Sequence, residues 1–183
     1  MPLAGSPPEP AASPAAAFSV RGADLLTARL ALRPWSDADL AAVLEGARQP
    51  HWAADFPADG DRVIAGFIDG HPDRRGTYGQ RLIIERASGL LVGAIGLFWP
   101  PGDGAVEFGY GVVASRRGRG YATEAARAMA AFALTAPGVH TVYADVELTN
   151  PASCRVLVKA GLERWSGDDR VARFRLRAAP RSA

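Results

Sequence analysis

The sequence contains very little cysteine and very little lysine. Its 183 residues include one cysteine, Cys154, so no disulfide can form within the chain and no cysteine cluster can hold a metal ion. Lys159 is the single lysine among 21 basic residues, and these balance 19 acidic residues to a net charge of +2. That small excess argues against a nucleic-acid or anionic-membrane partner held by overall charge.

The sequence also lacks long hydrophobic runs. No apolar stretch approaches the roughly 20 residues that span a bilayer, and the N-terminus has no basic segment followed by an apolar one, as a secretory signal has. We therefore expect a cytoplasmic protein without a membrane partner. The three histidines (His51, His71 and His140) do not have the spacing of metal ligands, so we predict no metal site.

What is present is typical of one globular domain with a tail. Hydrophobic residues make up 48% of the chain and charged residues 22%, as in folded proteins. Residues 1–20 are rich in proline and alanine and offer little large apolar surface to bury, so we predict a disordered tail there. Residues 21–183 are predicted to form a single domain.

The hydrophobic pattern predicts a mixed α/β arrangement of the α+β class, in the order β-α-α-β-β-β-α-β-α-β-β. One sheet with helices packed on it would satisfy this order. The strands that we can place lie at 25–33, 78–86, 90–99, 106–113, 139–146 and 171–177. One helix is predicted to begin at Ser36, and three others span about 61–69, 122–136 and 150–160.

The most informative segment runs from Val112 to Thr123, where a strand leads through a basic loop directly into a helix. The first N–H groups of a helix have no partner within it and carry partial positive charge. Gly118 and Gly120 allow the loop to turn its amides toward an anion, and the loop adds three cations (Arg116, Arg117 and Arg119). We therefore predict a site for a phosphate or a pyrophosphate.

Two other phosphate-binding motifs are excluded. Thr123 stands where the dinucleotide fingerprint needs glycine or alanine, and no Gly-Lys-Ser/Thr sequence occurs in the chain. From the loop alone, an ordinary solvated basic turn before a helix stays open as the alternative interpretation.

The loop resembles that of the GCN5-related N-acetyltransferase (GNAT) superfamily, Gln/Arg-x-x-Gly-x-Gly/Ala, which Arg117, Gly120 and Ala122 match. Glu107-Phe108-Gly109-Tyr110 and the segment from Asn150 to Leu162 are similar to its ribosomal-protein alanine acetyltransferase branch. The resemblance covers about residues 25–177. It implies a mostly antiparallel sheet of about seven strands, splayed between the fourth and fifth, with about four helices. It also implies acetyl-CoA as co-substrate and no metal.

The resemblance further implies where acetyl-CoA binds. The loop amides would hold its pyrophosphate and Asn150 would hydrogen bond to its pantetheine arm. A strand bulge would leave the amide near Val113 open to polarise the thioester carbonyl. The implied cofactor-binding residues are Val112, Val113, Arg117, Gly118, Arg119, Gly120, Tyr121, Ala122, Thr123 and Asn150.

Acetylation of an amine requires a neutral amine, an oxyanion stabiliser and a proton for the leaving thiolate. Glu107 is our first candidate for the base, Asp145 and Glu147 are rivals, and Glu85 is a weaker one. An acceptor that is already neutral would need no base. The tyrosine typical of the family's last helix is absent here, and Ser153 matches the serine that serves the thiolate in the resembling branch; a backbone hydrogen bond within the helix is the alternative for it.

The expected acceptor is a primary amine, on a protein N-terminus or a small molecule, which the sequence does not distinguish. Residues 51–75 hold five acids against three arginines. Two interpretations stay open for them: an acidic entrance to the site that suits a cationic amine, and a solvated helix surface. Other functions remain open: a non-catalytic acyl-CoA-binding module, an acyltransferase for another acyl-CoA, or an RNA-associated protein. The position of the Arg116–Gly120 run between a strand and a helix argues against RNA. The protein could be a monomer or a homodimer.

Overall fold

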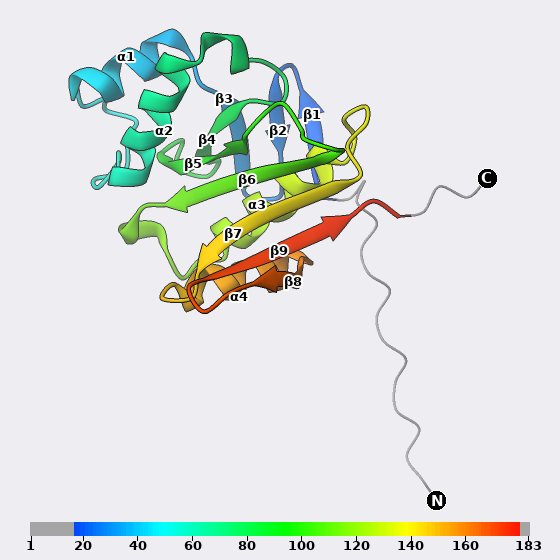
Figure 1. Ribbon diagram of the computed structural model, residues 1–183. Coiled ribbons are helices and arrows are strands. Elements are labelled where there is room, and N and C mark those ends of the chain that lie inside the picture. The colour runs from blue at the N-terminus through cyan, green and yellow to red at the C-terminus, as the bar shows by residue number, and fades with distance from the viewer. Residues whose placement is uncertain (1–16, 180–183) are drawn as a thin grey trace, which may run out of the picture.

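The computed structural model describes residues 17–179, and within them one nine-stranded sheet forms the centre of the molecule (Figure 1). The strands lie in the spatial order β1-β2-β3-β4-β5-β6-β7-β9-β8, and every neighbouring pair is antiparallel except β6 with β7. The strands are β1 (Ser19–Arg21), β2 (Asp24–Leu26), β3 (Leu30–Pro34), β4 (Gln80–Glu85), β5 (Leu91–Leu97), β6 (Ala105–Val112), β7 (Thr141–Glu147), β8 (Glu163–Gly167) and β9 (Val171–Arg177).

The sheet opens between β6 and β7. The two strands pair only from Ala105–Glu107 to Thr141–Tyr143, although β6 continues to Val112 and β7 to Glu147. Beyond Glu107 they diverge, which confirms the splay expected between the fourth and fifth of the predicted strands. The divergence leaves the edge of β6 without a neighbouring strand at the end that leads into the basic loop.

Four α-helices accompany the sheet within the described residues: α1 (Asp37–Glu45), α2 (Asp59–Gly70), α3 (Tyr121–Ala133) and α4 (Pro151–Ala160). Two short 3-10 turns, η2 (Pro72–Arg74) and η3 (Ala114–Arg116), precede β4 and the basic loop. Helix α3 runs across the sheet behind β6 and β7, and α4 packs beside it (Figure 1). Alanines fill the buried side of α3, including Ala125, Ala126 and Ala128, so the helix can approach the strands closely.

The helix ends follow their sequence signals. Ser36 caps α1, and its side chain accepts a hydrogen bond from the amide of Asp39, whose carboxylate in turn accepts from the amide of Ser36. Asn150 caps α4, and Gly161 ends it in the left-handed conformation, at φ 99°. These two caps fix the ends of α4 beside the open edge of β6.

Two differences from the predicted elements raise the strand number from seven to nine, and a third places the one predicted strand that had no position. The strand expected at 25–33 is a hairpin, because the Thr27 amide donates to the Leu30 carbonyl oxygen at 2.9 Å and reverses the chain between β2 and β3. Strand β1 covers residues 19–20, which were expected to be part of the tail; residues 1–16 lie outside the described residues. Strand β8 is exposed along its whole length, so it shows no alternation to detect.

Candidate functional site

A cleft of about 420 Å³ is bounded by the end of β6, the basic loop and helices α3 and α4. It brings together most of the residues that the sequence predicted for cofactor binding: Val112, Arg117, Gly118, Gly120, Tyr121, Ala122, Thr123 and Asn150, with Ser153 beside them. Val113, Arg119 and Glu107 do not line it.

The loop has the geometry of an anion site. Gly118 and Gly120 adopt left-handed backbone conformations at φ 73° and φ 78°, which side chains rarely allow. Gly120 is the N-cap residue of α3, and no side chain caps that helix. The first amides of α3 therefore face the cleft without a side-chain acceptor, and the helix dipole adds partial positive charge there.

Glu85 on β4 holds the loop from beneath. Its side chain accepts hydrogen bonds from Ser88 and from the Tyr121 hydroxyl, and its oxygens lie 3.8 Å from Arg116 Nε and 3.9 Å from an Arg119 nitrogen. The hydrogen bond from Ser88, followed by that from Tyr121, lowers the pKa of Glu85. Glu85 thus anchors the basic loop, and it does not line the cleft. Arg119 turns toward Glu85, which explains why Arg119 does not line the cleft.

Two more contacts fix the loop. The Ser115 amide and hydroxyl donate to the Asp55 carboxylate at 2.8 and 2.6 Å, and these bonds lower the pKa of Asp55. Arg29 donates to the Arg119 carbonyl oxygen at 2.8 Å. Asp55 is therefore engaged in the fold, as is Asp61, which caps α2 through the Ala58 amide at 2.9 Å. Two of the five acids expected to form an acidic entrance thus have structural partners.

The backbone of β6 differs from the expectation in one respect. Val113 is buried, and its amide donates to the Val92 carbonyl oxygen at 2.9 Å, so this amide is not available to a thioester. The register between β5 and β6 is continuous from Gly93–Val112 to Leu97–Phe108, without a bulge. Because alternate residues of a strand direct their amides to opposite sides, Tyr110 and Val112 direct theirs to the open side. The splay, rather than a bulge, exposes the amides.

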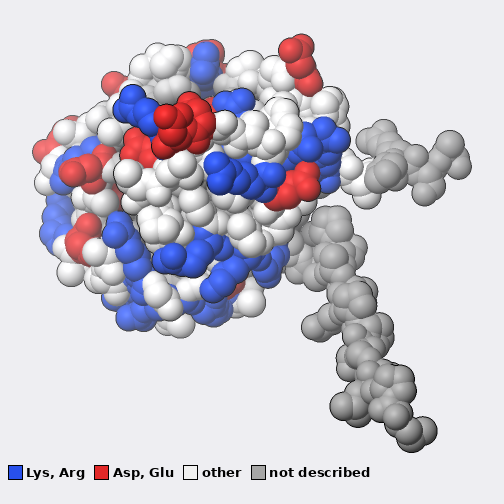
Figure 2. All heavy atoms as spheres, turned by 60° about the horizontal axis from the view of Figure 1, so that its bottom comes forward, with Lys and Arg blue, Asp and Glu red and all other residues white. Residues whose placement is uncertain are grey.

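Basic side chains surround the cleft. Arg116 and Arg117 line it from the loop side, and Arg117 Nε donates to the Val112 carbonyl oxygen at 3.0 Å. Arg155 and Lys159 line it from α4, and sequence reasoning missed both. Their spacing of four residues on a helix was the available signal. Figure 2 shows basic side chains predominating on the lower part of the face that it brings forward.

A second cavity of about 250 Å³ lies between the diverging strands β6 and β7 and shares three residues with the cleft: Tyr110, Asn150 and Ser153. Asn150 Oδ1 accepts from the Ser153 amide at 3.1 Å, which leaves its NH₂ group for another partner. The Tyr110 hydroxyl donates to the Ser153 carbonyl oxygen at 3.2 Å. We call this second space the inter-strand cavity, and it meets the cleft at these three residues.

The candidate bases differ in their surroundings. Glu107 occupies the last paired position of β6, opposite Tyr143, and burial, assisted by the Asp145 charge, raises its pKa, against the effects of Arg173 and of a hydrogen bond with Tyr143. Asp145 lines the inter-strand cavity but is held by two hydrogen bonds from Arg173 at 2.7 and 2.6 Å. Glu147 also lines that cavity and accepts from the Thr149 hydroxyl at 3.3 Å.

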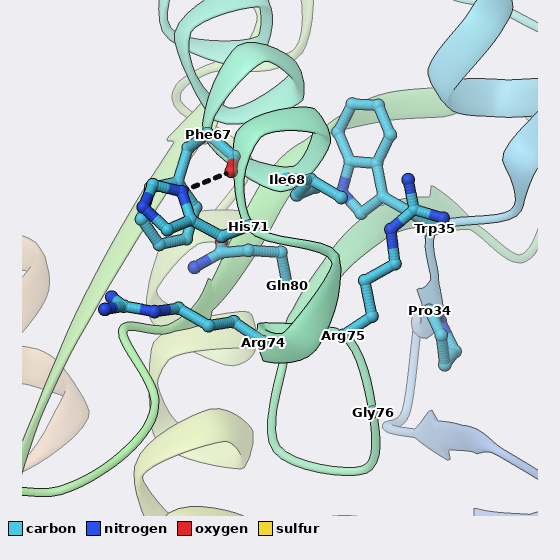
Figure 3. Close-up of a pocket in the computed structure, with 9 residues that line it drawn as sticks. All are labelled: Pro34, Trp35, Phe67, Ile68, His71, Arg74, Arg75, Gly76 and Gln80. Atoms are coloured by element: carbon cyan, nitrogen blue, oxygen red, sulfur yellow. Dashed lines mark hydrogen bonds between the residues drawn. The ribbon is translucent and has the colours of Figure 1, made fainter.

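A third, small cavity of about 40 Å³ lies between α2, η2 and the start of β4, apart from the two that meet (Figure 3). Arg74 and His71 extend to one side of it and Arg75 and Trp35 to the other (Figure 3). His71 Nδ1 lies 2.9 Å from the Phe67 carbonyl oxygen. None of the residues that line this small cavity takes part in the hydrogen bonds and ion pairs that hold the basic loop.

Between residues 17 and 179, no group of three or more His, Cys, Asp or Glu side chains could hold a metal ion. None of the helices in that range is long and apolar enough to cross a membrane.

The family model for the acetyltransferase (GNAT) domain matches residues 29–163, so the chain belongs to the GNAT acetyltransferases. The acetyltransferase of Agrobacterium tumefaciens has a similar structure, with a TM-score of 0.62 and 25% identity over 88% of this chain and 96% of that one. No curated protein sequence matches the chain.

Two more distant structures share the fold. A Salmonella typhimurium protein, described as an acetyltransferase and solved with its cofactor acetyl-CoA, has a TM-score of 0.59 and 19% identity over 85% of this chain and 97% of that one. A Vibrio cholerae spermidine N-acetyltransferase chimera has a TM-score of 0.59 and 16% identity over 82% and 96%. The chain is accordingly an N-acetyltransferase of a family that uses acetyl-CoA.

Proposed function

We propose that this enzyme transfers the acetyl group of acetyl-CoA to a primary amine by direct attack of the amine on the thioester. The observation that carries the proposal is the junction of the cleft and the inter-strand cavity at Tyr110, Asn150 and Ser153. Two substrates that enter from opposite sides of the splay would meet there. Direct transfer needs such a meeting point, because no covalent acetyl-enzyme is formed.

The residues of the cleft fit acetyl-CoA. The uncapped N-terminus of α3 and the two left-handed glycines suit its pyrophosphate. The outward amides of Tyr110 and Val112 and the NH₂ group of Asn150 offer donors to the amide carbonyls of its pantetheine arm. Arg155 and Lys159 add positive charge along the wall of the cleft that α4 forms, where further phosphate charge would be accommodated.

Glu107 remains our choice for the base. Its raised pKa brings it closer to the pH at which a carboxylate accepts protons most effectively in catalysis. Asp145 is disfavoured because both of its carboxylate oxygens accept hydrogen bonds from Arg173. Glu107 lines neither cavity, so we propose that it acts through a water molecule.

An amide of β6 would polarise the thioester carbonyl, and Val112 or Tyr110 takes the place that we first assigned to Val113. Ser153 lines the cleft and the inter-strand cavity from the first turn of α4, where its hydroxyl would hydrogen bond to the sulfur. Both proposals require the thioester to lie at the junction.

The acceptor is proposed to be a protein N-terminus, as in the ribosomal-protein alanine acetyltransferase branch, or a small amine. The inter-strand cavity argues against a non-catalytic acyl-CoA-binding module, because a protein that only binds acyl-CoA needs no second cavity for an acceptor. An assay for free thiol release from acetyl-CoA tests the proposal, with peptides bearing unblocked N-terminal residues and spermidine as amines. We expect acceleration with at least one amine and a product mass increased by one acetyl group. Tight acetyl-CoA binding without acceleration by any of these amines would contradict the proposed acceptor classes.

A further inference from the structure

The hydroxyl of Tyr110 lies at the junction of the two cavities. Tyr110 belongs to β6 and lines both the cleft and the inter-strand cavity. It is a half-buried residue, and its hydroxyl donates a hydrogen bond to the Ser153 carbonyl oxygen, 3.2 Å away in the first turn of α4. A strand side chain thus brings a phenol to the base of α4.

The helix itself supplies no phenol. The ten residues of α4, Pro151–Ala160, include no tyrosine. The thiolate that leaves acetyl-CoA nevertheless needs a proton. The Cys154 thiol is a poor candidate because it lines neither of the two cavities that meet. The Ser153 hydroxyl does line both, but an aliphatic alcohol gives up its proton far less readily than a phenol, whose ordinary pKa is about 10.

We propose that Tyr110 is the general acid of the reaction and donates its hydroxyl proton to the sulfur of CoA. The inference rests on the proposed function. As the amine nitrogen bonds to the acetyl carbon, the carbon–sulfur bond breaks and its electron pair stays on sulfur. The sulfur takes the Tyr110 proton and becomes a thiol. The tyrosinate regains a proton from water, and the proton that the amine loses leaves through Glu107.

The surroundings of Tyr110 keep it protonated until it is needed. Burial raises the pKa of its phenol, against the effect of the hydrogen bond with Ser153, and the Cys154 thiol raises it further. The other titratable side chains that line the two cavities with Tyr110 are Arg116, Arg117, Arg155 and Lys159 on one side, with Tyr121, and Asp145 and Glu147 on the other. The four cations favour a tyrosinate during turnover, while the two carboxylates oppose it.

The test compares Tyr110→Phe with Tyr78→Phe. Tyr78 stacks on Trp99, with ring centroids 4.6 Å apart, and lines neither cavity, so the control also removes one phenolic hydroxyl. Enzyme-dependent CoA release is measured with hydroxylamine as the amine, above the rate without enzyme. This probe is small and largely unprotonated near neutral pH, so it depends little on an acceptor pocket or on Glu107. Calorimetry with acetyl-CoA is run on every variant.

We expect Tyr110→Phe to lower kcat by about 100-fold, with little change in KM or in acetyl-CoA affinity, and Tyr78→Phe to behave as the wild type. The alkaline decline of kcat should disappear in Tyr110→Phe. Fluorotyrosine at position 110, a more acidic phenol, should move that decline to lower pH. If Tyr110 only packs against its neighbours, fluorotyrosine at this position should leave the alkaline decline of kcat at the same pH.

Three outcomes would overturn the inference. If Tyr110→Phe keeps wild-type kcat while Ser153→Ala loses it, Ser153 is the donor. If fluorotyrosine leaves the pH profile unchanged, Tyr110 does not donate the proton. If the wild type binds acetyl-CoA but does not accelerate the reaction with hydroxylamine, the junction does not promote thioester cleavage. A wild type that fails to bind acetyl-CoA would instead contradict the proposed function itself.

Discussion

At the scale of single residues, Glu107 differs from the other carboxylates near the splay. Asp145 is paired with Arg173. Glu85 anchors the basic loop, and its hydrogen bonds with Ser88 and Tyr121 lower its pKa. Glu107 instead has a raised pKa, caused first by burial and then by the Asp145 charge. This contrast is what we expect when one carboxylate exchanges protons and the others hold the structure.

Glu107→Gln should lower kcat by about 100-fold and leave acetyl-CoA affinity unchanged, because the amide cannot accept a proton. A base works only when ionised, so the wild-type kcat should fall as the pH drops through the pKa of Glu107. The raised pKa places this decline above the ordinary glutamate value of 4.5. The measurement is kcat against pH, with the exposed Glu45→Gln as control. The same acid decline in Glu107→Gln would contradict the assignment.

At the site, the sequence predicted the residues of the basic loop but not those that join the cleft from other elements. The loop residues are consecutive, so their shared role follows from a local pattern. Tyr110, Arg155 and Lys159 join the cleft from β6 and α4, and their proximity depends on the splay and on helix packing. The Val113 amide was misplaced for the same reason, since its partner Val92 lies on a neighbouring strand.

Among the elements, helix α2 carries a buried acid in its first turn. Asp61 is 4% exposed, and burial raises its pKa from 3.8 to about 6, although it accepts from the Ala58 amide. The folded state therefore binds this proton more tightly than the unfolded state does. Stability from Asp61 is fully present below about pH 4, falls as the pH rises to about 6, and is constant above that.

Asp61→Asn should remove this pH dependence, because the amide still accepts the cap hydrogen bond but cannot ionise. At pH 7 the variant should be more stable than the wild type, by about 3 kcal/mol at most. Urea unfolding at pH 4, 5, 6 and 7 measures the difference. Asp59→Asn in the same turn is the control, since Asp59 is exposed. Equal pH dependence of Asp61→Asn and the wild type would show that Asp61 is not buried in this way.

Elements with strong local signals were predicted well. The last strand, β9, has the predicted bounds, and the helix predicted over 150–160 is α4 (Pro151–Ala160) with its cap residue Asn150. The hairpin at Thr27 was missed because apolar residues alternate through the turn at Leu26, Ala28, Leu30 and Leu32, and the turn has no glycine or proline. Strand β8 was not placed because its exposed side chains carry no burial pattern.

At the scale of the whole molecule, a net charge of +2 conceals a local asymmetry. Four basic side chains line the cleft (Arg116, Arg117, Arg155 and Lys159), and no acidic residue of the described chain lines it with them. Such a cleft attracts a polyanion through a field that salt screens. Affinity for acetyl-CoA should therefore fall as salt concentration rises.

The double variant Arg155→Ala, Lys159→Ala should bind acetyl-CoA about tenfold more weakly at low salt, since each lost phosphate contact removes a modest part of the binding energy. Its affinity should also depend less on salt than that of the wild type. Arg62→Ala is a control on an exposed part of α2. Parallel salt dependences in the wild type and the double variant would exclude these residues from cofactor binding.

The proposed function depends most on the uncapped start of α3, which we propose holds the pyrophosphate of acetyl-CoA together with the left-handed Gly118 and Gly120. Calorimetric titration of Gly120→Asp with acetyl-CoA tests this binding role most directly, because the carboxylate would stand where phosphate charge is bound. Gly46→Asp is the matched control: Gly46 has a similar φ of 72°, with no atom within 4 Å of an added Cβ, and ends α1 away from the cleft. We expect Gly120→Asp to bind acetyl-CoA at least about 100-fold more weakly, a loss of about 2.7 kcal/mol of binding free energy, while Gly46→Asp binds as the wild type does. Unchanged affinity in a folded Gly120→Asp variant would contradict this binding role.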